Sequence, residues 1–94
     1  EIPYGYEGEI RSRSGIAKDH GVFVLNSPGT VDSDYRGEVR VILMNLGDKS
    51  FNINTGDRIA QLVISPVVKV EVLEVDELSD TGRNAGGFGH TGRR

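Results

Sequence analysis

The end of the chain, from Arg83 to Arg94, holds the residues whose types and spacing most clearly suggest chemistry. Glycine fills four of the seven positions from Gly86 to Gly92, and successive glycine N–H groups can form a concave nest for an anion. Arg83 adds a guanidinium suited to phosphate, and Thr91 adds a hydroxyl donor. Phe88 is the only large apolar residue here, so we interpret it as a lid that stacks on a flat ligand. The alternative is a disordered glycine-rich terminus.

A second anion site is indicated by Arg13-Ser14-Gly15, at the start of a single helical turn expected from Ser14 to His20. A helix N-terminus presents unpaired N–H groups that can hold a phosphate. Ser14 could add its hydroxyl and Arg13 its charge. The alternative is that Ser14 is an ordinary N-cap, with Gly21 as the matching C-cap.

The segment from Asn26 to Gly37 is too elaborate for a simple hairpin turn. Asn26 can present a donor and an acceptor together to the edge of an amide-like base. Asp32 follows the apolar Val31, so we expect it half-buried at a strand end, where a carboxylate can serve as a general base. Tyr35 offers a flat face to a sugar. The alternative is a polar turn whose residues are common there for backbone reasons.

Gln61 lies in an apolar run and therefore needs a hydrogen-bond partner, either another group of the chain or a ligand oxygen. The preceding Asp57 and Arg58 are interpreted as a turn ion pair of little energetic value. The sequence contains no His/Asp cluster with metal-ligand spacing and no Ser-His-Asp arrangement. A metal, if bound, would be carried mainly by substrate phosphates and water.

The elements that must position these residues are short β-branched runs between Gly, Asp, Asn and Pro turns, which is typical of a β-sandwich or barrel. From Leu78 onward no core periodicity remains, so we predict a β-barrel body over residues 1–77 and an arm over residues 78–94. The expected strands cover residues 7–12, 22–25, 37–46 and 58–65, followed after Pro66 by one marked by Val68, Val70 and Val72; Phe51 and Ile53 alternate with asparagines.

Composition limits the classes of protein and partner. The 94 residues form at most one small domain with a net charge of −3 and no cysteine, and the sequence pI is about 5.3 with a mean hydropathy of −0.32. An acidic chain argues against a nucleic-acid groove, and no apolar run reaches membrane-spanning length. We expect neither nucleic-acid nor membrane binding, and a cytoplasmic location (nuclear or mitochondrial in a eukaryote). The extended start at Glu1–Tyr4 is interpreted as a chain cut in the middle.

Taken in order, these segments resemble four of the five motifs of the trimeric deoxyuridine triphosphatase (dUTPase) family. The family's first motif, an Ala-Gly-aromatic-Asp-Leu segment, is absent from these residues. His90 stands where the family prefers Ser or Thr, and Asn84 where it prefers Gly. The second to fifth motifs correspond to residues 13–17, 26–37, 56–64 and 83–92.

The resemblance implies an all-β fold, a distorted jelly roll or β-clip barrel, assembled as a homotrimer with shared active sites. It implies hydrolysis of dUTP to dUMP and pyrophosphate with Mg²⁺ on the triphosphate. This reaction limits uracil incorporation into DNA and supplies dUMP for thymidylate synthesis. Asp32 would orient and deprotonate the attacking water, and Tyr35 would pack against the deoxyribose. The other implied substrate-binding residues are Asn26, Gly29, Thr30, Val31 and Arg40 for uracil, Arg13, Ser14, Gly15 and Gln61 for phosphates, and Arg83, Phe88, Gly89 and Thr91 from another subunit.

Two alternatives remain open at the level of sequence. The dCTP deaminases share the fold but place a Glu at the catalytic position and read cytosine, so the run from Asp32 to Tyr35 favours the hydrolase. A non-catalytic nucleotide sensor could keep the same pocket, because binding and hydrolysis use nearly the same residues.

Overall fold

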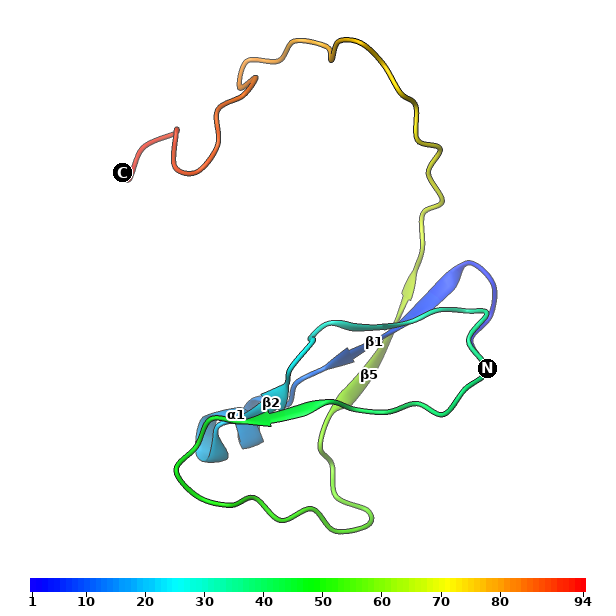
Figure 1. Cartoon of the computed structure of the whole chain (residues 1–94), viewed down its shortest axis with the longest axis vertical. Helices are drawn as coiled ribbons and strands as arrows, with labels where there is room; N and C mark the ends of the chain where they lie inside the picture. Colours follow the sequence, from blue (N-terminus) through cyan, green and yellow to red (C-terminus); the bar gives the residue numbers. More distant parts are fainter.

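The computed structural model describes residues 1–94, which form short strands and one short helix joined by long extended segments (Figure 1). The predicted all-β class is confirmed. In chain order the elements are β1 (Tyr6–Arg11), α1 (Ser14–His20), β2 (Val22–Val24), β3 (Gly29–Val31), β4 (Leu43–Asn45) and β5 (Gln61–Pro66).

β1 is the centre of a three-stranded antiparallel sheet of order β3-β1-β5. The register pairs Ile10 with Gly29 on one side and Arg11 with Gln61 on the other. Gly8 lies at the middle of β1, where an added Cβ would be 2.9 Å from the Cδ1 atom of Leu62. The missing side chain therefore leaves room for the Leu62 side chain of β5, the strand paired beside β1.

β2 and β4 form a separate two-stranded antiparallel ladder in which Val24 lies opposite Leu43. Val22 and Val24 are each 2% exposed, and Ile10 of β1 is 7% exposed. The backbone N–H of Val24 donates to the Ser12 hydroxyl at 2.9 Å, which fixes the end of β1 against β2. The small core thus lies where the two ladders meet.

Helix α1 begins at Ser14 and ends at His20 as predicted, but its N-cap is Arg13, in an extended conformation and without a side-chain capping bond. The prediction that Ser14 is the N-cap is wrong, because Ser14 is already helical. Gly21 ends the helix as predicted, with φ 69° and its N–H directed to the carbonyl of Ala17. An added Cβ at Gly21 would lie 2.7 Å from the backbone nitrogen of Gly47, so both the left-handed conformation and this close approach require glycine.

Four segments with a predicted strand pattern differ from the structure. The expected strand over 37–46 is reduced to β4, and no strand forms at Val68 to Val72 or around Phe51 and Ile53. The strand over 58–65 begins only at Gln61, and Pro66 is its last residue. An alternating pattern identifies an apolar face, but a strand also needs a neighbour for its N–H and C=O groups. These segments lack such a neighbour within the chain.

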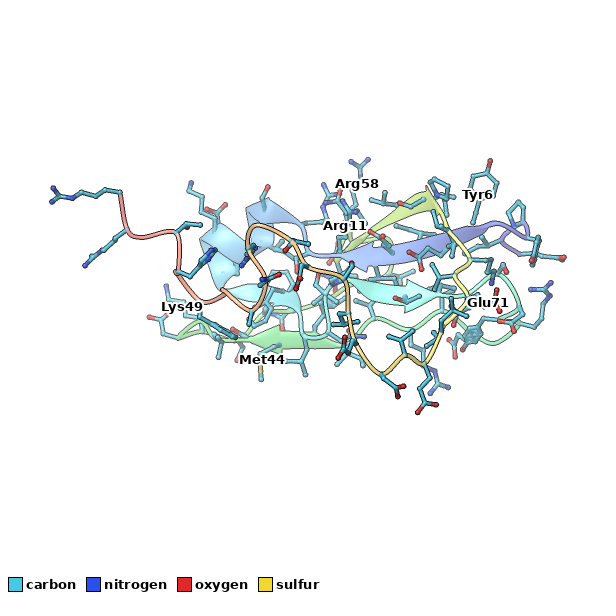
Figure 2. The ribbon with its side chains drawn as sticks, turned by 90° about the horizontal axis from the view of Figure 1, so that it is seen from above. Tyr6, Arg11, Met44, Lys49, Arg58 and Glu71 are labelled. Atoms are coloured by element: carbon cyan, nitrogen blue, oxygen red, sulfur yellow. The ribbon has the colours of Figure 1, made fainter.

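The molecule is flat and open, with principal extents of 54 × 41 × 18 Å. Figure 2 shows the strands in thin layers, with Arg11 and Arg58 on one side and Met44 and Lys49 on the other. After β5 the chain runs away from the sheets in a long arc (Figure 1), and Val68, Val70 and Val72 are 82%, 79% and 89% exposed. The one helix is too short to cross a bilayer.

Candidate functional site

A cavity of ≈ 440 Å³ opens where α1 begins and β5 begins. All the residues predicted to bind phosphate from the body of the chain line it, so the structure brings that set together. The lining residues are Arg13, Ser14, Gly15, Ile16, Asp19, His20, Arg58 and Gln61. We call it the phosphate cavity.

Ser12 positions both sides of the phosphate cavity. Its hydroxyl accepts the N–H of Val24, and its carbonyl accepts a hydrogen bond from Nε2 of Gln61 at 3.1 Å. The expected partner of the Gln61 carboxamide is therefore a group of the chain. The NH₂ group of Gln61 carries a second N–H that remains available to a ligand oxygen.

A second cavity, of ≈ 160 Å³, lies beside β3. It gathers all the residues predicted to contact the uracil together with Tyr35, and we call it the base cavity. An added Cβ at Gly29 would lie 3.3 Å from Nδ2 of Asn26, so glycine lets the amide approach the strand closely. The lining residues are Ile10, Asn26, Gly29, Thr30, Val31, Tyr35, Glu38, Val39 and Arg40.

Tyr35 is held at the edge of the base cavity by local bonds. Its hydroxyl donates to the Glu38 carbonyl at 2.7 Å, and its N–H donates to the Asp32 carbonyl at 3.1 Å. The ring lies directly against Gly37, where any Cβ would collide with it. Because Arg40 Nε donates to the Glu38 carboxylate at 3.2 Å, Glu38 links the ring and the guanidinium.

Asp32 lies outside both cavities and lines a third, of ≈ 310 Å³, together with Tyr4, Tyr6 and Lys69. The expectation that Asp32 is half-buried is wrong for this chain, since its side chain is exposed. The reason is local: β3 is an edge strand that ends at Val31, and the chain turns away at Asp32. Lys69 Nζ lies 5.5 Å from the centre of the Tyr4 ring.

The glycine-rich tail contributes to none of these cavities. Arg83 Nε donates to the Gly86 carbonyl, while Gly89 and Thr91 lie in the turns that follow. Phe88 is fully exposed, at 112%, and has φ 47°, an uncommon conformation for a bulky residue. Within one copy, the tail residues are thus not brought to the other predicted site residues.

Asn84 shows why the family can prefer glycine at this position. Its φ is 45°, in the left-handed region that glycine and asparagine tolerate best. Its side-chain oxygen accepts the Thr81 N–H at 2.7 Å, and its own N–H donates to the Thr81 hydroxyl at 2.9 Å. Asparagine therefore keeps the turn that glycine would allow.

Sequence reasoning missed one cationic residue of the phosphate cavity. Arg58 does not pair with Asp57, whose carboxylate instead accepts the Asn54 N–H at 2.8 Å. The predicted turn ion pair is therefore wrong, because Asp57 closes the 54–57 turn. The spacing of Arg58, three residues before Gln61 in the same segment, was the available signal. Asp19 and His20 of α1 were also not identified as lining residues.

Comparison with known proteins identifies relatives over nearly the whole chain. A family described as dUTPase matches residues 1–92. A deoxyuridine 5'-triphosphate nucleotidohydrolase of Nautilia profundicola is 60% identical over 93 residues, which are 99% of this chain and 66% of that protein. The enzyme of the same name from a Hydrogenobaculum strain is 63% identical over 94 residues, 100% of this chain and 65% of that protein.

Solved structures agree with the sequence matches. A mutant of the Staphylococcus bacteriophage 80alpha dUTPase, with dUpNHpp, has a TM-score of 0.80 and 26% sequence identity, covering 99% of this chain and 70% of that one. This likeness supports the predicted jelly-roll type of architecture. The chain spans 59% to 66% of the length of four curated relatives, all named deoxyuridine 5'-triphosphate nucleotidohydrolase.

Proposed function

This chain belongs to the dUTPase family, and on that premise we propose that it hydrolyses dUTP to dUMP and pyrophosphate. The observation that carries the proposal is that the predicted site residues fall into two separate cavities. The phosphate-binding set lines one cavity and the uracil-binding set lines another. The phage dUTPase structures similar to this chain hold dUpNHpp, a dUTP analogue, which supports the same class of ligand.

The base cavity suits uracil and deoxyribose. The Asn26 amide can meet the donor and acceptor edge of the base, and the backbone of β3 from Gly29 to Val31 offers further polar groups. The Tyr35 ring, held by Glu38 and by the absence of a side chain at Gly37, supplies a flat wall for the sugar. A fixed wall excludes a 2'-hydroxyl by steric contact.

Asp32 is proposed as the general base. It would accept a proton from the water that attacks the α-phosphorus, while the bond from that phosphorus to the α–β bridging oxygen breaks and pyrophosphate leaves. Positioned donors and a placed water are the main requirements of phosphoryl transfer. Asp32 is exposed in the single chain, which supports a site that is completed and covered by another copy.

We infer a homotrimer whose copies share each site. In one copy the phosphate cavity, the base cavity and Asp32 line separate hollows, and the tail reaches none of them. Large apolar side chains are also exposed, including Leu46 at 73%, Leu73 at 72% and Leu78 at 87%. Exposed apolar surface of this extent is typical of an interface, and a segment without a core of its own is a natural element to donate to a neighbour.

The residues present fit a magnesium ion that arrives with the nucleotide. No group of three or more His, Cys, Asp or Glu side chains gathers in the structure, and Asp19 is the only carboxylate lining the phosphate cavity. Mg²⁺ is commonly held by substrate phosphates, water and one or two carboxylates. When bound, it would neutralise phosphate charge; Arg13, Ser14 and Gln61 would hold and orient the phosphates.

The proposal is tested by incubating the full chain with dUTP, dCTP or UTP in the presence of Mg²⁺ and measuring pyrophosphate and ammonia. The expected result is pyrophosphate from dUTP, with much less from UTP and no ammonia from dCTP. Ammonia release from dCTP would instead assign a deaminase. Tight binding of dUpNHpp without any turnover of dUTP would assign a nucleotide sensor.

A further inference from the structure

Phe51 is half-buried, although every other residue between Leu46 and Arg58 is exposed. We call residues 46–58 the connecting segment, because they join β4 to the chain that leads into β5. The Phe51 ring lies against the ring of His20, the last residue of α1, with the ring centres 5.0 Å apart and the planes tilted by 54°. This separation and tilt lie in the range that packed aromatic side chains prefer. The connecting segment thus packs on α1 through one side chain.

Hydrogen bonds fix only the start of the connecting segment. The N–H of Leu46 donates to the Gly21 carbonyl at 2.9 Å, and Nδ2 of Asn45 donates to the Lys49 carbonyl at 2.9 Å. The bonds that follow lie within the 54–57 turn and join it to no other element. The aromatic contact is therefore what holds the middle of the segment against the rest of the molecule.

His20 connects this contact to the phosphate cavity. His20 lines the cavity at the end of α1, Arg58 lines it at the end of the connecting segment, and Phe51 itself does not line it. Figure 1 shows the connecting segment, in green, leading from beside α1 round to β5. Gln61 is fixed by the ladder of β5 with β1, whereas Arg58 lies outside that ladder. The position of the cavity wall at Arg58 relative to α1 therefore depends on the connecting segment.

We propose that Phe51 is a positioning residue of the phosphate cavity. By packing on His20 it holds the connecting segment against α1, and so keeps the wall at Arg58 at a fixed distance from the wall at His20. Phe51 acts on the cavity through His20 and makes no contact with the nucleotide. The inference rests on the proposed function for the identity of the ligand.

The test is calorimetric titration of the full chain with tripolyphosphate, which probes the phosphate cavity, and with dUMP, whose base and sugar belong to the base cavity. We expect Phe51→Ala to weaken tripolyphosphate by about 3- to 10-fold, the range for loss of an aromatic pair. Binding of dUMP should stay within about twofold, as for a distant, independent site. The KM for dUTP should rise by the same factor as the tripolyphosphate dissociation constant, with kcat nearly unchanged.

Three further variants show whether the ring itself is responsible. Phe51→Tyr keeps the ring and should retain the wild-type affinity, whereas Phe51→Leu keeps an apolar side chain without the ring and should lose most of it, in a protein that stays folded. Ile53→Ala is the matched control: Ile53 is an apolar residue of the same segment, 53% exposed, and takes no part in the ring contact. It should leave both affinities unchanged.

A double-mutant cycle tests whether Phe51 acts through His20. His20→Ala should weaken tripolyphosphate, and Phe51→Ala should add no further loss in that background, because the contact is already absent. Losses that add in full would show that the two residues act independently, and would overturn the proposal.

The outcomes separate this inference from the proposed function. If the wild type hydrolyses dUTP but Phe51→Ala and Phe51→Leu bind tripolyphosphate as tightly as the wild type, the positioning role is wrong and the function stands. Equal weakening of dUMP and tripolyphosphate, unfolding of both variants in thermal melting, or no binding of tripolyphosphate by the wild type would also overturn the role. If tripolyphosphate binding follows the ring pair but dUTP is not hydrolysed, the positioning role stands and the proposed function fails.

Discussion

In the sheets, the residues of the proposed site are held by partners distant in sequence, whereas in the tail they are held only by near neighbours. Gln61 is bonded to Ser12 across 49 positions, and Gly29 is fixed opposite Ile10 in a ladder. The hydrogen bonds over 81–92 join residues three positions apart, such as Thr81 with Asn84 and Gly89 with Gly92. Local bonds alone do not fix where a segment lies relative to the rest of the molecule.

This difference assigns separate tasks to the two regions. The sheets arrange the phosphate and base cavities before a ligand arrives, which lowers the cost of binding. The tail, with Phe88 fully exposed, must gain its order from the nucleotide or from another copy. Substitutions of buried residues in the sheets should therefore lower both stability and activity, and those in the tail should lower activity alone.

The largest effect on activity is expected at Asp32, the proposed general base, which follows β3 directly. Asp32→Asn should lower kcat by about 10²- to 10⁴-fold, the usual contribution of a positioned base, because the amide cannot accept the proton of water. Affinity for dUpNHpp should stay within several-fold, since the amide has nearly the same shape. Steady-state kinetics with calorimetry measures both quantities. Near wild-type turnover would reduce Asp32 to a turn residue.

Deleting every residue after Arg83 should produce the contrast between the two regions most clearly. Loss of the Phe88 ring removes a stacking contact worth about 1–3 kcal/mol per base, so kcat/KM should fall by about 10- to 100-fold. The melting temperature should hardly change, because the tail buries no core residue. Ile10→Ala is the opposite control: truncating this 7% exposed side chain should cost about 2–5 kcal/mol of unfolding free energy. Equal losses of stability and activity on deletion would make the tail structural.

A smaller effect is expected at the wall of the base cavity. Tyr35→Ala should raise the kcat/KM for UTP relative to dUTP by up to about 10²-fold, the limit for rejection of an added hydroxyl in an apolar pocket. The ring excludes the hydroxyl by steric contact. Gly37→Ala should shift the ratio in the same direction, because its Cβ would displace the ring. An unchanged ratio in both variants would place the sugar selectivity elsewhere.

Local signals in the sequence were sufficient for β1, β2 and α1. Alternation identified the strands, and Gly21 marked the left-handed end of the helix. The same local signals predicted strands over residues 37–42 and Val68 to Val72 that do not form, because no other segment of this chain lies beside them to complete a ladder. Such partners leave no mark in the alternating pattern itself.

The candidate site shows the same limit. The phosphate and base sets could be predicted because their segments resemble motifs of the dUTPase family, and the structure gathers both sets. Arg58 was missed because it was paired with the adjacent Asp57, whose carboxylate instead closes the turn from Asn54 to Asp57. The exposure of Asp32 was also missed, since it depends on β3 being an edge strand.

On the proposed function, a complete site takes Asp32 and the tail from different copies of the chain. The most direct measurement is the activity of mixed oligomers refolded from equal amounts of Asp32→Asn and the variant lacking residues 84–94, each nearly inactive alone. In a random mixture half of the Asp32 positions and half of the tails are intact. If they come from different copies, roughly a quarter of the sites recover and so does roughly a quarter of the wild-type activity. If both come from one copy, every site remains defective, and activity no higher than that of the separate variants would contradict the sharing of sites between copies.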